Sequence, residues 1–412
     1  MAILSSKKDE FRIYRYHVKK LYLIFDKDTM KMEPTRLNSF TVLENYLENL
    51  YPVIKIDLAL EDSVYNKIIK NKSSIKIRIE LVKYYMKGTS DKKSTKTVHM
   101  KQTFSLILDD ALTASSENLH SKEYPHGDVN EMNAVTINME LFLFAGDLIR
   151  ANTGIINDVL KNCTVTDALM YMMNKIGIRR NLLMPVSDNP TVYPELVIPP
   201  LKISKALGFL DSYYGVFRTG TIIYFGIDRN YILPYCKRAK VLAENEQEIV
   251  NIVIPKTGSS ITDKLCSAKK KGAPSSIYVI GDASSFEPVN RDVSGKILNA
   301  ETVDVVDNER GRINYTKGSN KKVVIKPGES TFYKESYVAR VNATATVITI
   351  AFKNCDLSVF TPNKIYQFLF EDSKLMKLYK GKYHLVNADI SYIKEERDLT
   401  GGAICTFHKN VN

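Results

Sequence analysis

The residue types that most often perform chemistry are scattered along this 412-residue chain. Its histidines are isolated apart from His120 and His126, which lie on a polar stretch where they could share a metal ion. The pairs Asp26–Asp28 and Asp109–Asp110 could act as general acid and base, but aspartate is also common at strand ends for local backbone reasons. We therefore expect no catalytic residue, no metal site and no cofactor. An acid and a base far apart in sequence stay open as an alternative.

The sequence also lacks the short motifs that mark nucleotide, metal and acyl-transfer sites. It contains no HExxH, no GxGxxG after a strand and no GxSxG, and the "SGK" at 294–296 has no leading glycine at the P-loop spacing. Its 5 cysteines include no CxxC pair, which favours a reducing compartment over a disulfide framework or a zinc site. No apolar run reaches the ~18 residues of a membrane span, and the N-terminal apolar run is too short for a signal peptide.

The chain is basic, with 58 lysines and arginines against 46 acidic residues and a net charge of +12. This charge favours anionic partners such as nucleic acid or an acidic protein surface, although a basic surface can also serve solubility alone. The main cluster is Lys269, Lys270 and Lys271, which we take as candidate partner contacts. Known nucleic-acid modules are missing, but aromatic strands flanked by lysines could form a barrel that stacks bases, so a nucleic-acid-binding β-barrel is an alternative.

Two blocks of the sequence alternate between apolar and polar residues, as antiparallel strands with one buried face do. The alternating faces are Ile54, Ile56, Leu58 and Leu60; Ile75, Ile77, Ile79 and Leu81; Ile348, Ile350 and Phe352; and Tyr366, Phe368 and Phe370. Each block is of the kind that forms a small barrel or sandwich. The stretch 37–50 fits either a strand or a short helix.

Two helices are expected between these blocks. Over 164–176, Thr164 is a plausible N-cap with Asp167 in the first turn, and Gly177 can end the helix. Its apolar face comprises Val165, Ala168, Leu169, Met172, Met173 and Ile176, which we interpret as core.

The second expected helix covers 204–214 and runs into a hairpin. Ser204 can cap it, Leu207 and Leu210 repeat at helical spacing, and Gly215 can end it. The stretch 185–201 has five prolines and should be extended. The hairpin that follows, up to 234, is rich in aromatic residues and poor in catalytic ones.

We therefore expect a mixed, mainly β fold with two antiparallel β-barrel domains and an α/β insert between them. The expected divisions are a first barrel over 1–135, the insert over 136–255, a loop-rich basic segment over 256–340 and a second barrel over 341–412.

This order of parts resembles the baseplate or tail hub proteins of tailed bacteriophages and related contractile injection systems. The resemblance is carried by "CTVTDALMYMMNKIGI" leading into "VYPELVIPPLKISKALGFLDSYYGVFRTGTIIYFGIDRNYILP", and by "FTPNKIYQFLFED" with "YKGKYHLVNADISYI". It is clearest over 155–235 and 345–410.

The resemblance implies a structural, non-enzymatic virion protein made in the bacterial host cytoplasm. Two barrels per subunit would let a homotrimer form a ring that joins the tail tube, or other distal tail proteins, to a central spike or tip. The insert would pack against a neighbouring subunit, with Tyr213, Tyr214 and Phe217 as candidate contacts. Lysines would line a lumen for DNA or a tape-measure protein, or lie outside. Another ring or wedge component, or a cell-wall hydrolase, is an alternative.

Overall fold

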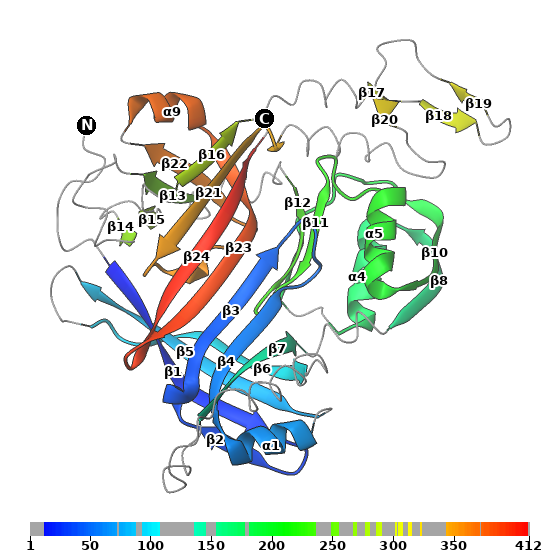
Figure 1. Ribbon diagram of the computed structural model, residues 1–412. Coiled ribbons are helices and arrows are strands. Elements are labelled where there is room, and N and C mark those ends of the chain that lie inside the picture. The colour runs from blue at the N-terminus through cyan, green and yellow to red at the C-terminus, as the bar shows by residue number, and fades with distance from the viewer. Residues whose placement is uncertain are drawn as a thin grey trace, which may run out of the picture.

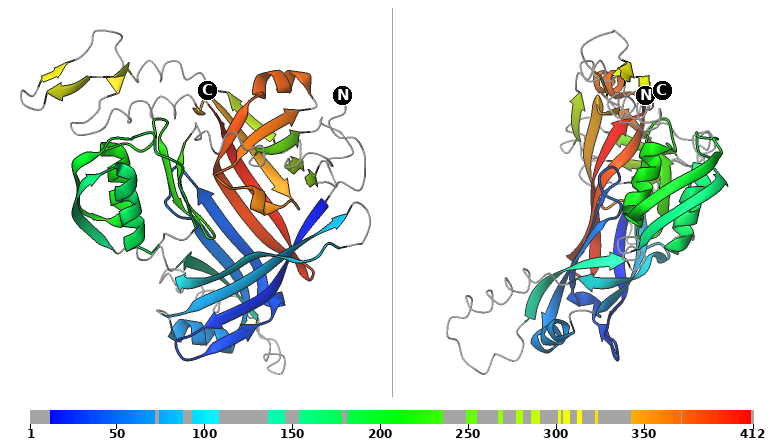
Figure 2. Two further views of the ribbon diagram at one scale, coloured as in Figure 1. Left: turned by 180° about the vertical axis from the view of Figure 1, so that it is seen from behind. Right: turned by 90° about the vertical axis from the view of Figure 1, so that its right-hand side faces the viewer.

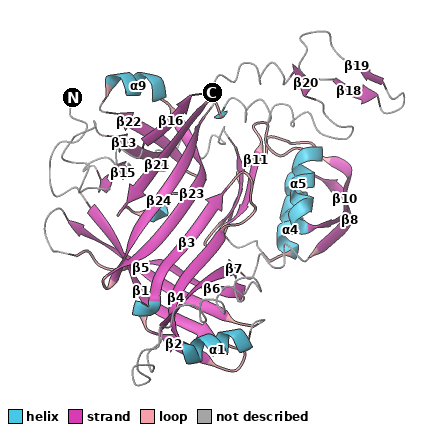
Figure 3. Ribbon diagram, in the orientation of Figure 1, coloured by secondary structure: helices cyan, strands magenta, loops and turns pink. Residues whose placement is uncertain are grey.

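The computed structural model describes residues 12–71, 74–87, 93–107, 136–145, 154–177, 181–235, 249–254, 267–269, 277–280, 286–290, 301–302, 304–307, 312–314, 322–323, 343–370 and 372–410. The fold is mainly β, as predicted, with few helices among many strands (Figure 3). The helices are α1 (Asp62–Lys70), α4 (Val165–Lys175), α5 (Ile203–Tyr213), α9 (Ser373–Tyr379) and the short 3-10 helices η2 (Pro34–Arg36) and η6 (Leu357–Val359). None of the helices in this part of the chain is both long and apolar enough to cross a membrane.

One large sheet contains most of the strands (Figure 1). Its members are β1 (Arg12–Ile24), β2 (Thr29–Met32), β3 (Leu37–Asn45), β4 (Val53–Glu61), β5 (Lys76–Lys87), β6 (Thr97–Ile107), β7 (Thr136–Ala145), β13 (Ile249–Ile254), β14 (Ser267–Lys269), β15 (Ile277–Ile280), β16 (Phe286–Asn290), β21 (Thr346–Lys353), β22 (Ile365–Phe370), β23 (Lys382–Glu395) and β24 (Asp398–Lys409). All four alternating faces predicted from the sequence are buried in its core. The ambiguous stretch 37–50 begins with strand β3.

Eight of these strands form a closed circuit of antiparallel pairs. The circuit runs β23–β3–β4–β7–β6–β5–β1–β24 and closes because β24 also pairs with β23. Along β4, for example, alternate apolar residues are buried, as period-two alternation requires. Residues from the first and last parts of the chain therefore share one core.

A second set of strands extends the sheet from the same hairpin. On one side β22 pairs with β23, and β13 and β15 follow in parallel pairings. On the other side β21 pairs with β24, and β16 follows. The parallel pairing of β13 with β22 differs from the all-antiparallel block expected, since strands far apart in sequence can pair in either direction. Among the described strands this set does not close into a circuit.

The hairpin β23–β24 therefore belongs to both sets (Figure 1). With 14 residues, β23 spans about 45 Å, long enough to cross from one set to the other. Its start pairs with β22 at Tyr383, its remainder pairs with β3 from Asn387 onward, and the register shifts between these points. The expected division places 341–412 in a second barrel domain, and this hairpin pairs with strands of both strand sets.

The strand pairing also bears on two other parts of the expected division. The expected insert begins at residue 136 and so includes β7, which lies between β4 and β6 in the closed circuit. The segment 256–340 was expected to be loop-rich, yet β14, β15 and β16 pair into the large sheet. Two small sheets also lie in it, formed by β17 (Glu301–Thr302) with β20 (Lys322–Val323) and by β18 (Asp304–Asp307) with β19 (Arg312–Asn314). Strand pairing is decided by contacts across the chain, which local composition does not record.

The α/β insert is a separate layer beside the large sheet (Figure 2). Strands β8 (Ile155–Cys163) and β10 (Tyr193–Lys202) form an antiparallel pair, and α4 and α5 cover one face of it. Strands β11 (Thr221–Phe225) and β12 (Asn230–Pro234) form the predicted hairpin, with β9 (Leu182–Leu183) parallel to β12. The second core joins these elements and is built around the predicted apolar faces of both helices.

The two helices begin differently. Thr164 and Asp167 form a reciprocal capping box at α4, as the sequence predicts, and Gly177 follows the helix with φ of 74°. The predicted cap at Ser204 is wrong, because α5 begins at Ile203 with Lys202 as its N-cap. The N–H of Ile203 donates instead to the carbonyl of Gly154 at 3.0 Å, directly where β10 ends.

Candidate functional site

The β11–β12 hairpin is the wall between the two cores. Ile222, Tyr224 and Tyr231 face the main core, whereas Phe225 and Ile232 face the insert core. The cross-strand register places Tyr224 opposite Tyr231 on one face and Ile223 opposite Ile232 on the other. In Figures 1 and 2 the hairpin lies between β3 and the α4–α5 pair. The aromatic residues of the hairpin, for which the sequence suggests no catalytic role, thus pack between two layers of the molecule.

The tip of this hairpin is held against the large sheet. Gly226 donates its N–H to the carbonyl of Arg229 at 3.0 Å, and a Cβ at Gly226 would lie 2.7 Å from that oxygen, so the tight turn requires glycine. Gln102 on β6 donates from Nε2 to the carbonyl of Ile227 at 2.9 Å and to Oδ1 of Asp228 at 3.3 Å. These contacts fix the tip over the inner face of the sheet.

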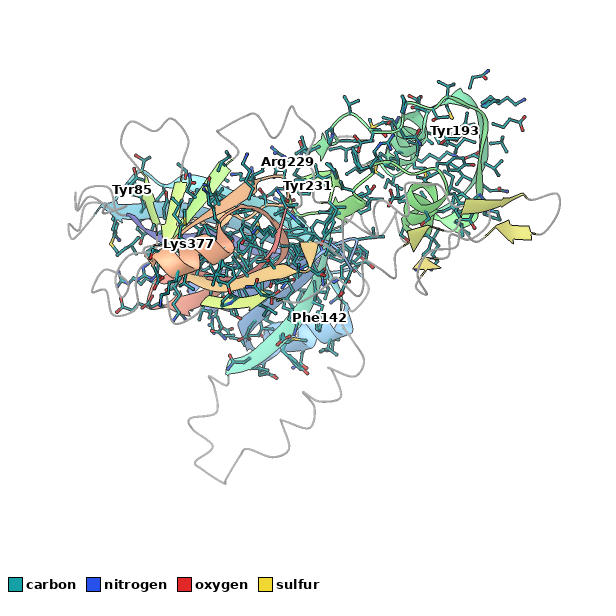
Figure 4. The ribbon with its side chains drawn as sticks, turned by 90° about the horizontal axis from the view of Figure 1, so that it is seen from above. Tyr85, Phe142, Tyr193, Arg229, Tyr231 and Lys377 are labelled. Carbon is teal, nitrogen blue, oxygen red and sulfur yellow. The ribbon has the colours of Figure 1, made fainter. Side chains whose placement is uncertain are left out.

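A cavity of about 170 Å³ lies beneath the tip. Its walls come from β3, β6, β23, the η6 region and the hairpin. The lining residues are Phe40, Val42, Glu44, Tyr46, His99, Met100, Gly226, Ile227, Asp228, Arg229, Tyr231, Leu357, Ser358, Phe360, Thr361, Pro362, Ile390 and Tyr392. Figure 4 shows the labelled Arg229 and Tyr231 close together between the large sheet and the insert that carries Tyr193.

Glu44 is the acidic group in the wall of this cavity. Its Oε2 accepts from the hydroxyl of Tyr46 at 2.5 Å, and its Oε1 accepts a long hydrogen bond from Tyr224 at 3.5 Å. Burial of the carboxyl, only partly offset by these two donors, raises the pKa of Glu44 to about 7. The group therefore changes charge near neutral pH.

His99 belongs to an aromatic cluster that also lines the cavity. Its Nε2 lies 2.6 Å from the hydroxyl of Tyr392, and its ring packs edge-on against Tyr16 with 4.8 Å between centroids. Burial, together with the nearby charge of Lys83, lowers the pKa of His99 to about 4. The imidazole is therefore neutral at physiological pH.

Polar contacts next to this cluster tie the two ends of the chain together. The hydroxyl of Tyr16 accepts from the N–H of Leu357 at 2.8 Å and donates to the carbonyl of Cys355 at 2.9 Å. Lys83 pairs with Asp356 at 2.7 Å, and the Nδ1 of His17 lies 2.9 Å from Asp398. These groups are satisfied by one another and stabilise the fold. In the described part of the chain, no group of three or more histidines, cysteines or carboxylates could hold a metal ion.

The predicted partner contacts in the insert have different surroundings. Tyr213 is 38% exposed and stacks on Phe209 with 4.3 Å between ring centroids. Tyr214 accepts from the N–H of Val197 at 3.1 Å, which covers the edge of β10. Phe217 is buried in the insert core, where it packs and presents no surface. A partner contact stays a prediction for the exposed Tyr213 and for Tyr214.

The other predicted site residues are only partly described. The backbone of Lys269 ends β14, while Lys270 and Lys271 lie outside the described residues. The pairs His120 with His126 and Asp109–Asp110 also lie outside them. Asp28 accepts from Lys67 at 2.5 Å, so this carboxylate forms an ion pair that joins the β1–β2 connection to α1.

Glu44 and His99 were not among the residues predicted from the sequence. Glu44 shares a strand face with Phe40, Val42 and Tyr46, all of which are buried, and a carboxylate in such an apolar series is a signal that could have been noticed. His99 gave no signal, because its partner Tyr392 is 293 residues away.

Residues 11–409 match the model of a family described as "Bacteriophage PBS1 gene 109 protein". The chain belongs to this family. The predicted resemblance is confirmed, since tail proteins are among its structural neighbours. The tail protein from Neisseria meningitidis MC58 shares its fold, with a TM-score of 0.51, 8% identity and coverage of 96% of this chain and 97% of that one. The 43 kDa tail protein of prophage MuSo2 from Shewanella oneidensis matches with a TM-score of 0.46, 10% identity and coverage of 95% and 97%. No curated protein matches the chain.

Proposed function

We propose that the chain is a structural, non-enzymatic hub of a phage tail or baseplate, present in the virion, where a homotrimeric ring joins the tail tube to the central spike or tip. The observation that carries this proposal is the likeness of fold to a tail protein over 96% of this chain and 97% of that one. Membership in a bacteriophage protein family supports it. The polar groups of Tyr16, Lys83 and Asp356 pair with other groups of the fold, which is consistent with a structural role.

The sheet topology supports the two-barrel part of this proposal. The closed circuit of eight antiparallel strands is the pairing that a small barrel requires. The second set, which extends from the shared hairpin, is the proposed second barrel. Three subunits with two barrels each would place six barrels around a ring. Such a ring suits a junction between a sixfold tail tube and a threefold spike or tip.

The outer face of the insert supports a contact between subunits. Ile155 is 72%, Val159 53% and Val197 47% exposed, and Val159 lies directly opposite Val197 on the face that α4 and α5 leave uncovered. Within the described residues β8 pairs with β10 alone, so its other edge can accept a further strand. We propose that this face meets a neighbouring copy, and that the exposed Tyr213 on α5 is a further contact.

The net positive charge of the chain supports contact with an anionic partner in the lumen of the proposed ring. With a net charge of +12, a ring of three chains would favour passage of DNA or of an acidic tape-measure protein. Lys269, Lys270 and Lys271 are the proposed contacts.

Gold-labelled antibodies against this chain, applied to particles of a phage that encodes it, test the proposal. We expect label at the distal end of the tail. Label around the tail periphery would favour a wedge component, and no label would overturn a virion role. Two assays on the purified chain separate the other classes. DNA binding that weakens steeply with salt would favour a nucleic-acid-binding barrel, and clearing of a cell-wall suspension would favour a hydrolase.

A further inference from the structure

We propose that the cavity beneath the β11–β12 tip binds an alkylammonium group, with Glu44 as its anionic partner. The inference goes beyond the structural role proposed above and does not depend on it. It rests on the composition of the cavity wall, where a carboxylate and several aromatic rings line one partly open cavity.

The first reason is that Glu44 has no cationic partner. Arg229 also lines the cavity, but among the described residues no lysine, arginine or histidine forms an ion pair with Glu44. An ionised carboxylate offers about four acceptor positions, and within the described residues the hydroxyls of Tyr46 and Tyr224 are its hydrogen-bond donors. Other carboxylates of the fold, such as Asp356 with Lys83, are paired. A ligand with N–H donors and a positive charge would therefore complete the site.

The second reason is the aromatic wall. Tyr46, Tyr231, Tyr392 and Phe40 line the same cavity as Glu44. The faces of aromatic rings attract cations, and cages of this kind recognise organic ammonium groups. The wall carries two carboxylates, Glu44 and Asp228, against one guanidinium, Arg229, so its acidic groups disfavour an anion. A neutral apolar group would leave the Glu44 carboxylate unpaired.

The third reason is size. A cavity of about 150 Å³ holds one benzene molecule, so the 170 Å³ measured here suits one small organic group. A bare metal ion would need several ligating side chains, and the described residues provide no such group. The free amine of a small molecule and the side chain of a lysine share the required chemistry.

Ligand-detected saturation-transfer NMR with n-butylammonium tests the proposal on the full chain, at a pH above 7 so that Glu44 is ionised. We expect saturable binding with a Kd on the order of 1 mM, which is typical of so small a ligand. Neutral n-butanol, which has the same shape, should bind at least about tenfold more weakly because it lacks the charge. This comparison needs only the wild-type chain. Equal binding of the two probes, or no binding of butylammonium, would overturn the proposal.

Glu44→Gln should weaken butylammonium binding at least about tenfold, because the isosteric amide removes the charge and keeps the shape. Glu48→Gln is the matched control, since Glu48 is exposed and lies outside the cavity wall. It should leave binding unchanged, and a loss equal to that of Glu44→Gln would contradict a specific site. N-acetyl-lysine-methylamide distinguishes the sources: binding of this probe as well as butylammonium indicates a lysine side chain from a partner, and binding of butylammonium alone indicates a free amine.

Discussion

The large sheet and the α/β insert differ in how far apart in sequence their contacts lie. In the sheet, Tyr16 bonds to Leu357 and Lys83 pairs with Asp356, over separations of 341 and 273 residues. In the insert, all elements lie within 154–235, and the cap of α4 joins residues only three apart. Local contacts form early and independently, whereas distant ones require the whole chain to be in place. The comparison predicts that the insert is a separate unit of stability.

The largest expected effect comes from Leu210→Asp on α5. Leu210 is fully buried in the insert core, and a carboxylate there has no partner, so we expect a loss of about 4 kcal/mol or more. Hydrogen exchange should increase across the insert while β23 and β24 keep their protection. Lys205→Asp on the exposed side of the same helix is the control. A uniform loss of protection along the whole chain would contradict the prediction that the insert is a separate unit of stability.

The next effect is a pH dependence of the large sheet. The folded-state pKa of Glu44 is about 7, above its usual 4.5, so between these values the folded chain binds a proton that the unfolded chain releases. The contribution of Glu44 to the free energy of unfolding therefore falls by up to about 3 kcal/mol as the pH rises from 4.5 to 7. Glu44→Gln removes this loss, so its stability relative to wild type should rise over this window in denaturant titrations. A difference that stays flat with pH would show that Glu44 is not buried as described.

A smaller effect is expected where the two ends of the chain meet. A Cβ at Gly401 would lie 2.6 Å from the Tyr16 ring and 2.7 Å from Leu357, so Gly401→Ala should cost about 2 kcal/mol. At the adjacent Gly402 the nearest atom would be 3.4 Å away, and Gly402→Ala should cost less than about 1 kcal/mol. Denaturant midpoints measure both. Equal values for the two variants would contradict the close approach of Tyr16 to β24.

The smallest effect sharpens the description of the insert. Thr164→Ala removes the capping box of α4 and should cost about 1 kcal/mol. Ser204→Ala should change stability by less than about 0.5 kcal/mol, because Ser204 does not cap α5. Thermal unfolding of both variants checks this difference. A larger loss of stability for Ser204→Ala than for Thr164→Ala would indicate that Ser204 caps α5.

The same contrast explains what could be predicted from the sequence. The capping box at Thr164 and the apolar faces of the strands follow from local spacing, and the structure contains them as predicted. The position of β7 between β4 and β6, and the sharing of β23–β24 by two strand sets, depend on pairings between distant segments. The cavity could not be predicted for the same reason, since its wall gathers residues from five separate parts of the chain. Only Glu44, a carboxylate on an apolar strand face, left a local signal.

The most direct test of the proposed ring is the mass of the purified chain, measured by light scattering on a sizing column. The account predicts three chains of 46.8 kDa, or about 140 kDa, free of nucleic acid. Combining Ile155→Lys with Val159→Lys should reduce this to a single chain, while Leu378→Lys, at an exposed position of α9, should leave it unchanged. A wild-type mass of one chain, or a trimer that survives the double substitution, would contradict the account.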